Sequence, residues 1–442
     1  MPDILIPEQE SDRKAKPDSA AGYSLKAFHV MAKPTGPICN LDCKYCFYLE
    51  KEKLYPGKST GQSSWAMADD VLENYIRQYI EGQQVPVVNF AWQGGEPTLL
   101  GVEFFRKAVT LQKRHAGGKQ ITNAFQTNGV LLDDEWGAFF AENQFLVGIS
   151  IDGPRELHDR YRVSKGGQPT FDRVMRGIEC LKKHRVEFNT LTTVHRHNAD
   201  HPLEIYRFLK EIGSGFMQFI PIVERVANAP GRDGLFLVAP GAEEAATVSP
   251  WSVEPLQYGK FLCAIFDEWV RGDVGRYFIQ TFDVALESWV GVPQSLCVFR
   301  ETCGAATVME HNGDVYSCDH FVYPEYRLGN LMSEPLSALV NLPRQQKFGQ
   351  DKRDKLPRQC RECEMLFACN GECPKHRFMR TPEGEPGLNY LCASYKLFFG
   401  HIDPYMCFMT DELAHARPPA NVMQWALRRD AARVEPGKMH NS

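Results

Sequence analysis

The chain has 442 residues, 24% of them charged and 43% hydrophobic, so it can bury a large core and is long enough for two domains. Its net charge of −5 gives no reason to expect nucleic acid as the main partner, and its apolar runs are too short to span a membrane. Residues 1–24 lack the hydrophobic segment of a secretory signal. Fourteen cysteines without an export signal indicate metal ligation in a reducing, cytoplasmic compartment rather than disulfides.

A cysteine-rich loop follows the first predicted strand. Residues 1–24 are typical of a flexible lead-in, and residues 25–31 form a mostly apolar run of strand length. After a stretch with proline and glycine, three cysteines are spaced C-x3-C-x2-C at Cys39, Cys43 and Cys46. Three thiolates from one loop can hold three corners of a [4Fe-4S] cluster and leave one iron open. A closed structural zinc site would need a fourth ligand, which makes a zinc knuckle the weaker interpretation.

Strand and helix patterns then alternate along the chain. Helices are predicted at about 68–81, 102–115, 171–184 and 202–212, from Asp133 onward, and after residue 254. Strands are predicted at 85–92, 145–151, 187–195 and 216–223, and in a run that ends at 126–129. Six strand–helix units favour a parallel sheet with helices outside it and are too few for a closed (β/α)8 barrel. We therefore expect an α/β protein with an open, partial (β/α)6 barrel.

Several candidate binding residues lie at or beyond the ends of these strands, where such folds place their chemistry. The turn at 93–97 (QGGEP) contains Gly95, whose backbone can approach a ligand closely. A Gly-Gly turn alone can also be a plain tight turn. Ser150 and Arg162 are polar residues of the fourth strand end and the loop beyond it, where a solvated loop is the alternative. Val223 ends the sixth strand and can line an adenine pocket, but an isolated apolar residue carries no signal of its own.

The character of the chain changes after the barrel. Residues 224–252 are rich in Gly, Ala and Pro and predict a loop excursion, while strand patterns at 306–310 and 315–318 flank the turn His-Asn-Gly-Asp and predict a hairpin. Eight cysteines crowd the following stretch: Cys297, Cys303, Cys318, Cys360, Cys363, Cys369, Cys373 and Cys392. Eight thiolates suit two fully ligated [4Fe-4S] clusters, and two four-cysteine zinc sites remain open on this chemistry alone.

Asp319 directly follows one of these cysteines, Cys318. A surface carboxylate is the default interpretation. Its position is of interest because a cluster ligand fixes the neighbouring backbone, and a general base must be held close to the reacting atom.

Taken together, these motifs resemble the anaerobic sulfatase-maturating enzymes, which are radical S-adenosylmethionine (SAM) proteins with a C-terminal iron–sulfur domain of the SPASM type. The resemblance runs from about residue 25 to 400 and rests on segments 39–48, 93–99, 126–129, 145–154, 218–220, 313–319 and 360–373. It implies a domain order of lead-in, radical SAM barrel, connecting loop and helices, SPASM domain and tail, which we place at 1–24, 25–235, 236–295, 296–400 and 401–442.

The resemblance also implies roles for individual residues. Cys39, Cys43 and Cys46 would hold the cluster that binds SAM, and Tyr45, Gly95, Ser150, Arg162 and Val223 match the positions that contact SAM. A near auxiliary cluster would use Cys297, Cys303, Cys318 and Cys373, and a far one would use Cys360, Cys363, Cys369 and Cys392. Asp319 matches the proposed base. The implied cofactors are SAM and three [4Fe-4S] clusters.

The implied reaction is oxidation of a cysteine or serine in a sulfatase to Cα-formylglycine, with hydrogen removed from Cβ and a proton taken by Asp319. Its implied partners are an unfolded sulfatase polypeptide and an electron donor such as flavodoxin or ferredoxin, with no nucleic acid and no membrane. Two alternatives stay open: a radical SAM maturase that cross-links a ribosomal peptide, and a zinc-stabilised binding protein without catalysis. The residues alone do not decide between cysteine and serine as the target.

Overall fold

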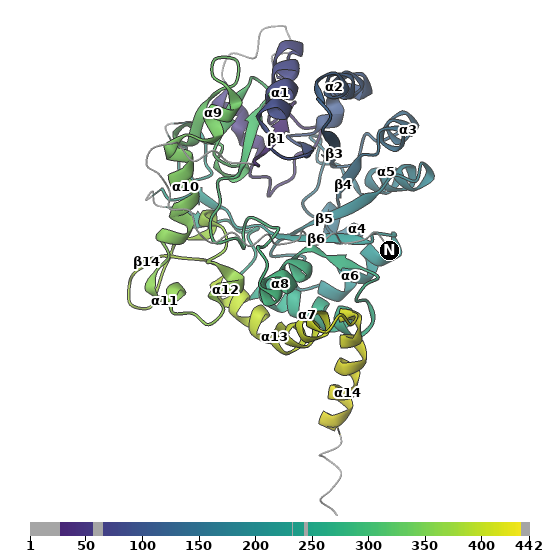
Figure 1. Ribbon diagram of the computed structural model, residues 1–442, viewed down its shortest axis with the longest axis vertical. Helices are drawn as coiled ribbons and strands as arrows, with labels where there is room; N and C mark the ends of the chain where they lie inside the picture. The colour runs from purple at the N-terminus through teal and green to yellow at the C-terminus, as the bar shows by residue number, and fades with distance from the viewer. Residues whose placement is uncertain (1–26, 56–64, 232, 243–245, 435–442) are drawn as a thin grey trace, which may run out of the picture.

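A ten-stranded sheet forms the centre of the protein. The computed structural model describes residues 27–55, 65–231, 233–242 and 246–434. Six neighbouring strands are parallel and lie in chain order: β1 His29–Lys33, β2 Val87–Trp92, β3 Gln120–Thr127, β4 Leu146–Ser150, β5 Phe188–Val194 and β6 Phe216–Pro221. Their helices are α1 Asp69–Gly82, α2 Gly101–His115, α3 Asp134–Glu142, α5 Phe171–Lys183, α6 Pro202–Glu211 and α7 Gln257–Gly272 (Figure 1). The predicted six strand–helix units and partial barrel are confirmed.

Local sequence explains these elements. In α1 the apolar residues recur at helical spacing, and all six lie against the sheet: Val71, Leu72, Tyr75, Ile76, Tyr79 and Ile80. Helix α3 begins where predicted, because Asp133 caps it by accepting a hydrogen bond from the backbone N–H of Trp136 at 3.0 Å. Strand β1 runs to Lys33, beyond the predicted end, and residues 25–26 of that prediction lie outside the described residues.

The sheet continues from the barrel into the C-terminal domain. Strand β10 (Ala306–Glu310) pairs in parallel with β1, and β11 (Asp314–Tyr316) and β12 (Arg327–Asn330) extend the sheet in antiparallel fashion. The predicted hairpin around His-Asn-Gly-Asp is therefore confirmed. At the opposite edge the two-residue strand β9 (Phe278–Ile279) pairs with β6. The two domains thus share one sheet.

The excursion at 224–252 contains regular structure that was not predicted. Strands β7 (Arg225–Ala227) and β8 (Ala246–Val248) form an antiparallel pair. Glu50 accepts hydrogen bonds from the backbone N–H groups of Phe236 and Leu237, at 3.0 and 2.7 Å. These contacts attach the excursion to the segment that follows the cysteine loop. The excursion is therefore part of the folded structure beside that loop.

The C-terminal residues also belong to the folded core. Helix α13 (Cys392–Ala414) packs on α7 and on α8 (Gln280–Val290), and α14 (Val422–Val434) packs on α7, at the bottom of Figure 1. The proposed boundary between the SPASM domain and the tail, at residue 400, therefore falls inside a helix. A continuous buried stripe explains why the helix does not stop there: Phe398, Ile402, Met406 and Met409.

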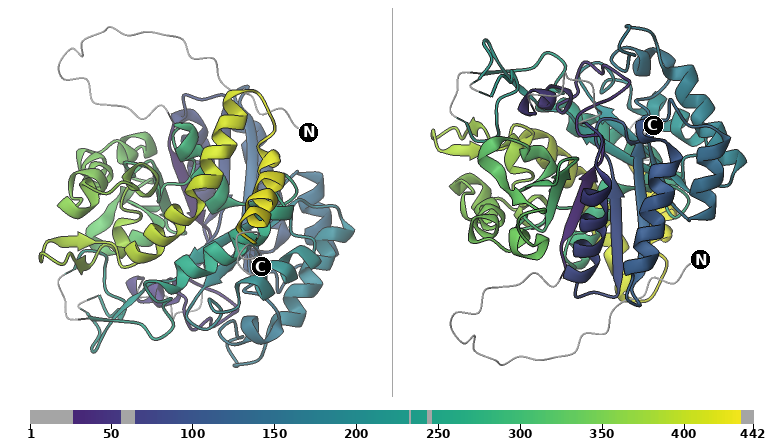
Figure 2. Two further views of the ribbon diagram at one scale, coloured as in Figure 1. Left: turned by 90° about the horizontal axis from the view of Figure 1, so that it is seen from below. Right: turned by 90° about the horizontal axis from the view of Figure 1, so that it is seen from above.

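The remaining short elements lie mostly in the C-terminal domain, which projects to one side of the barrel (Figure 2). Its helices are α9 Leu336–Val340, α10 Pro343–Asp354, α11 Arg358–Arg361 and α12 Leu366–Cys369, and its hairpin pairs β13 Met379–Arg380 with β14 Pro386–Leu388. Helix α4 (Arg155–Asp159) and six 3₁₀ turns complete the structure: η1 Leu49–Leu54, η2 Pro97–Leu100, η3 Asp319–Phe321, η4 Pro324–Tyr326, η5 Pro374–His376 and η6 Pro419–Asn421. No helix in the described part of the chain is both long and apolar enough to cross a bilayer.

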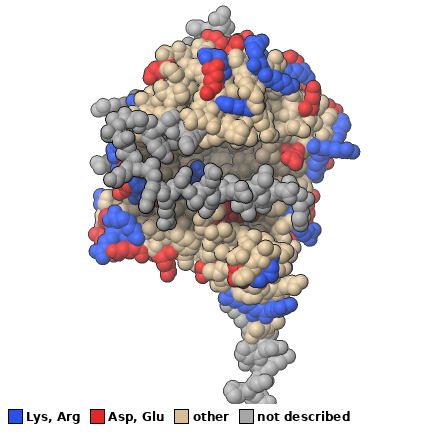
Figure 3. Space-filling model, in the orientation of Figure 1, with Lys and Arg blue, Asp and Glu red and all other residues tan. Residues whose placement is uncertain are grey.

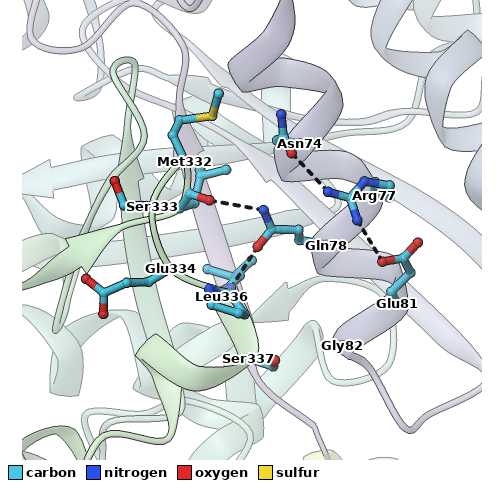
Figure 4. A pocket seen from close by; sticks show the side chains of 12 residues that line it. Asn74, Arg77, Gln78, Glu81, Gly82, Met332, Ser333, Glu334, Leu336 and Ser337 are labelled. Atoms are coloured by element: carbon cyan, nitrogen blue, oxygen red, sulfur yellow. Dashed lines mark hydrogen bonds and ion pairs between the residues drawn. The ribbon is translucent and has the colours of Figure 1, made fainter.

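A polar cleft of about 480 Å³ marks the seam between α1 and the segment 331–337 (Figure 4). Gln78 bridges the seam, because its amide donates to the carbonyl of Leu331 at 3.0 Å and accepts from the N–H of Leu336 at 2.8 Å. The cleft lies beside the C-terminal half of α1, at the end of the barrel opposite the cysteine loop. We therefore interpret it as a domain contact rather than an active site.

Candidate active site

The cysteine loop lies at the carboxyl end of β1 and is fastened to a neighbouring segment. Asp42 N–H donates to the carbonyl of Val163 at 2.8 Å, and Lys44 N–H donates to that of Tyr161 at 3.1 Å. All three cysteines of the loop are partly buried and free of disulfides. Burial, followed by the nearby Glu96 charge, raises the pKa of Cys39 to about 12, so metal binding there must release a proton.

The described residues contain no compact group of cysteine sulfurs of the kind that surrounds a zinc ion. A tetrahedral zinc site with Zn–S bonds of about 2.3 Å brings its sulfurs to about 3.8 Å from one another. Within the described residues, no three cysteine sulfurs approach within 4.8 Å of one another. A four-iron cluster places an inorganic core between its thiolates and spreads them farther apart. The described group that does meet this limit, Asp134, Cys180 and His184, lies on the outside of the barrel, where Lys183 pairs with Asp134.

The glycine-rich turn after β2 braces the cysteine loop. Gly95 N–H donates to the carbonyl of Gly36 at 2.7 Å, and a Cβ on Gly95 would lie only 1.9 Å from the carbonyl oxygen of Ile38. Only glycine therefore fits this approach. A backbone N–H can only donate, so the carbonyl oxygen of Gly95 is its backbone group that can accept a hydrogen bond from an ammonium ligand.

Glu96 connects neighbouring segments through its carboxylate, a role that the sequence did not reveal. Its carboxylate is fully buried and accepts hydrogen bonds from the N–H of Thr98 at 3.0 Å, the hydroxyl of Thr127 at 2.8 Å and the N–H of Asn128 at 2.8 Å. Asn128 in turn donates to the side chain of Asn40 at 2.7 Å. The ends of β2 and β3 are thereby joined to the cysteine loop.

Asp152, which follows β4, is a second buried carboxylate that we did not single out. The phenol of Tyr45 donates to it, as do Arg162 Nε at 2.9 Å and Thr193 N–H at 3.0 Å. Burial alone would raise the pKa of Asp152, but the Arg162 charge and the nearby histidines outweigh burial and lower it. Two of the predicted SAM contacts, Tyr45 and Arg162, therefore meet at one ionised carboxylate.

The other predicted SAM contacts lie at the same edge of the sheet. Ser150 is the buried last residue of β4, and Val223 is buried two residues beyond the end of β6. Because parallel strands end at a common edge, these side chains share it with the cysteine loop and with Gly95.

We expect loss of the Asp152 carboxylate to destabilise the site and weaken SAM binding. Asp152→Ala leaves Arg162 buried and unpaired, which typically costs about 3–5 kcal/mol. Anaerobic thermal unfolding and equilibrium SAM binding measure the two effects. The matched control is Asp172→Ala, which breaks an exposed pair with Arg155 and should leave stability nearly unchanged. An Asp152 variant as stable as that control would contradict the assigned role.

The eight C-terminal cysteines fall into the two predicted groups of four. The far group, Cys360, Cys363, Cys369 and Cys392, lines one cavity together with Tyr395 and Phe399. In the near group, the pKa of Cys318 is raised mainly by burial and further by the charges of Cys373 and Cys297. Burial raises the pKa of Cys303 to about 11, and Cys297 adds to that shift. Each predicted set of ligands is thus brought together in the fold.

Asp319 lies between the cysteine loop and the near group. Its carboxylate, 19% exposed, forms a close ion pair with the buried ammonium of Lys33, which sits 3.5 Å from the ring centre of Tyr48. Burial would raise the pKa of Asp319, but the Lys33 charge lowers it overall, so the carboxylate is ionised and can accept a proton. The adjacent His320 contacts Phe47 at 5.5 Å between ring centres and has Nδ1 3.7 Å from the sulfur of Cys373.

Lys33 gave no functional signal in the sequence, because a lysine at a strand end usually lies in solvent. A second buried ion pair, between Lys375 and Glu224, lies in the same region. On the face shown in Figure 3, by contrast, acidic and basic side chains are interspersed over the surface. The charges that matter here are therefore buried ones, which only the fold brings together.

Comparison with known proteins agrees with this geometry. A model of the radical SAM superfamily matches residues 34–209, and one of an iron–sulfur cluster-binding domain matches residues 297–364. A serine-type anaerobic sulfatase-maturating enzyme of Bacteroides thetaiotaomicron is 50% identical over 410 residues, 93% of this chain and 97% of that protein. A cysteine-type enzyme of Clostridium perfringens is 35% identical, over 85% of this chain and 96% of its own length. The solved structure of native anSMEcpe with bound AdoMet and Cp18Cys peptide has a TM-score of 0.75 at 34% identity, covering 87% of this chain and 99% of that one.

Proposed function

Because this chain belongs to the anaerobic sulfatase-maturating enzymes of the radical SAM superfamily, we propose that it oxidises a serine of a sulfatase polypeptide to Cα-formylglycine. The observation that carries the choice of serine is the 50% identity to a serine-type enzyme along 97% of that protein. Cysteine is the second candidate, favoured by the cysteine-type relative at 35% identity. A cross-linking maturase and a non-catalytic zinc protein have no comparable support.

The cofactors we propose are SAM and three [4Fe-4S] clusters. Cys39, Cys43 and Cys46 would hold the first cluster, and the near and far groups of four cysteines would hold the other two. When bound, these groups supply a radical that removes hydrogen from the substrate Cβ and a place for the second electron. The grouping of the C-terminal thiols and the match to an iron–sulfur cluster-binding domain support this assignment.

The residues around the first site would bind and orient SAM. The Gly95 carbonyl oxygen would accept from its amino group, and Arg162, fixed by Asp152, would face its carboxylate end. Tyr45, Ser150 and Val223 would line the rest of the site. The ion pair with Lys33 would hold Asp319 ionised and in place, ready to take the proton from the substrate hydroxyl.

The substrate would be an unfolded sulfatase segment, because a residue destined for oxidation must reach a site enclosed between two domains. The peptide bound in the anSMEcpe structure supports this partner. A low-potential carrier such as flavodoxin or ferredoxin would supply electrons, and we propose a cytoplasmic setting with neither nucleic acid nor membrane as partner.

Serine specificity can be tested with two matched sulfatase peptides that differ only in Ser or Cys at the target. We expect the reduced holoenzyme to form the aldehyde from the serine peptide, which mass spectrometry detects after hydrazide labelling. A peptide with alanine at the target is the control. Aldehyde from the cysteine peptide alone would overturn the choice of serine but leave the family assignment intact.

A further inference from the structure

One short link joins the two auxiliary cluster groups. Cys369 belongs to the far group and Cys373 to the near group, and the three residues between them all have left-handed backbone: Asn370 at φ 44°, Gly371 at 68° and Glu372 at 50°. Left-handed backbone is unfavourable for residues other than glycine, so two of these positions must be held by their surroundings. The link is therefore a constrained turn.

The side chain of Arg377 contacts the whole length of this turn. Its guanidinium donates to the carbonyls of Asn370 at 2.8 Å, Gly371 at 2.8 Å and Glu372 at 2.9 Å, so it bonds every carbonyl of the link. It also donates to the carbonyl of Lys352 in α10. A Cβ on Gly371 would lie 2.7 Å from Arg377 Nη2, which shows how closely the guanidinium fits the turn.

The surroundings fix the turn from its other side and add a second cation. The buried Glu372 carboxylate contacts His376 Nδ1 at 2.9 Å and accepts from Asn389 at 2.7 Å. Lys352, also buried, donates to the carbonyls of Cys297 at 2.9 Å and Val298 at 2.8 Å, within the near group. Asn389 also donates to the carbonyl of Gly371, at 3.3 Å, but Arg377 is the one of these groups that bonds all three carbonyls of the link.

We propose that Arg377 is the positioning residue of the auxiliary cluster pair: it fixes the spacing of the two clusters through the 370–372 link and makes them easier to reduce through its charge. This inference rests on the proposed three-cluster function. A guanidinium keeps its charge in proteins, and a cation beside a cluster stabilises the more negative, reduced state. The planar fork is needed because an ammonium cannot reach three carbonyls in the same way.

Two variants separate spacing from charge. Arg377→Gln removes the charge, and Arg377→Lys keeps it but loses the fork. For the glutamine variant we expect auxiliary midpoint potentials more negative than those of the wild type in an EPR-monitored redox titration. For the lysine variant we expect potentials near the wild type but a changed EPR line shape from the interaction of the two reduced clusters. Arg380→Gln, an exposed arginine that bonds the carbonyl of Gly384, is the control and should change neither.

The outcomes are distinguishable. Wild-type potentials and line shape in both Arg377 variants would overturn the proposal, and equal potential shifts in both would overturn the charge effect. If the glutamine variant assembles no auxiliary clusters, the lysine variant decides: a changed line shape or loss of auxiliary iron supports the proposal, and a wild-type line shape overturns it. Wild-type protein with only about four irons would instead refute the proposed cofactor set, whatever Arg377 does.

Discussion

Replacing Cys39, Cys43 and Cys46 together by alanine is expected to abolish SAM cleavage while leaving two clusters in place. Anaerobically reconstituted wild-type protein should hold about twelve irons per chain, and the triple variant about eight. The reason is that the two C-terminal groups draw their ligands from a different part of the chain. Iron analysis and quantification of 5′-deoxyadenosine after reduction measure the two effects.

The chain offers a matched control for this experiment. Cys180, Cys263 and Cys407 lie in helices α5, α7 and α13, outside all three groups, and their joint replacement by alanine should leave iron content and SAM cleavage unchanged. Loss of all iron in the first variant, or continued SAM cleavage, would show that the loop cysteines do not hold a separate cluster.

Asp319→Asn should stop formylglycine formation without stopping SAM cleavage. Asparagine keeps the shape of the side chain but cannot take the substrate proton, so the rate of aldehyde formation should fall by roughly 10²–10⁴-fold. The residue pairs with Lys33 and is not one of the predicted ligands of SAM or iron, so 5′-deoxyadenosine and iron should stay near wild-type levels. Both products are measured in the same reaction with a sulfatase peptide.

The control for Asp319→Asn is Glu325→Gln, an exposed carboxylate in the next 3₁₀ turn that should have no effect. Aldehyde formation near the wild-type rate would show that Asp319 is not the base. Joint loss of iron and both products would show that the ion pair with Lys33 is structural.

Local patterns predicted the barrel well because each unit has its own signal. The apolar spacing of α1 and the Asp133 cap of α3 are legible in a few residues. The pairing of β10 with β1 could not be predicted in this way, because no local pattern in residues 306–310 indicates which distant strand they pair with. The course of α13 through residue 400 was missed for a related reason: its buried stripe faces α7, which only tertiary packing reveals.

For the site, the sequence indicated residues that belong to a motif and missed those that support them. The cysteines and Gly95 stand in recognisable spacings. Glu96 and Asp152 lie in segments that carry the resemblance but were given no role, and Arg377 lies outside those segments. Their roles depend on burial among backbone groups from distant segments, such as the Asn128 N–H that donates to Glu96 across 32 positions. Charged residues are rarely buried without partners, and those partners cannot be identified from spacing alone.

The pairing of β1 with β10 bears on how the protein is made. Val30 and Ala32 are fully buried in a strand with neighbours on both sides, and 278 positions separate His29 from Thr307 on β10. At about 5–20 residues per second, a ribosome needs on the order of tens of seconds to deliver that partner. Until then β1 lacks its β10 neighbour, and the unpaired N–H and C=O groups of a strand edge can pair with another chain. A chaperone that shields this edge during translation would therefore raise the yield of folded protein.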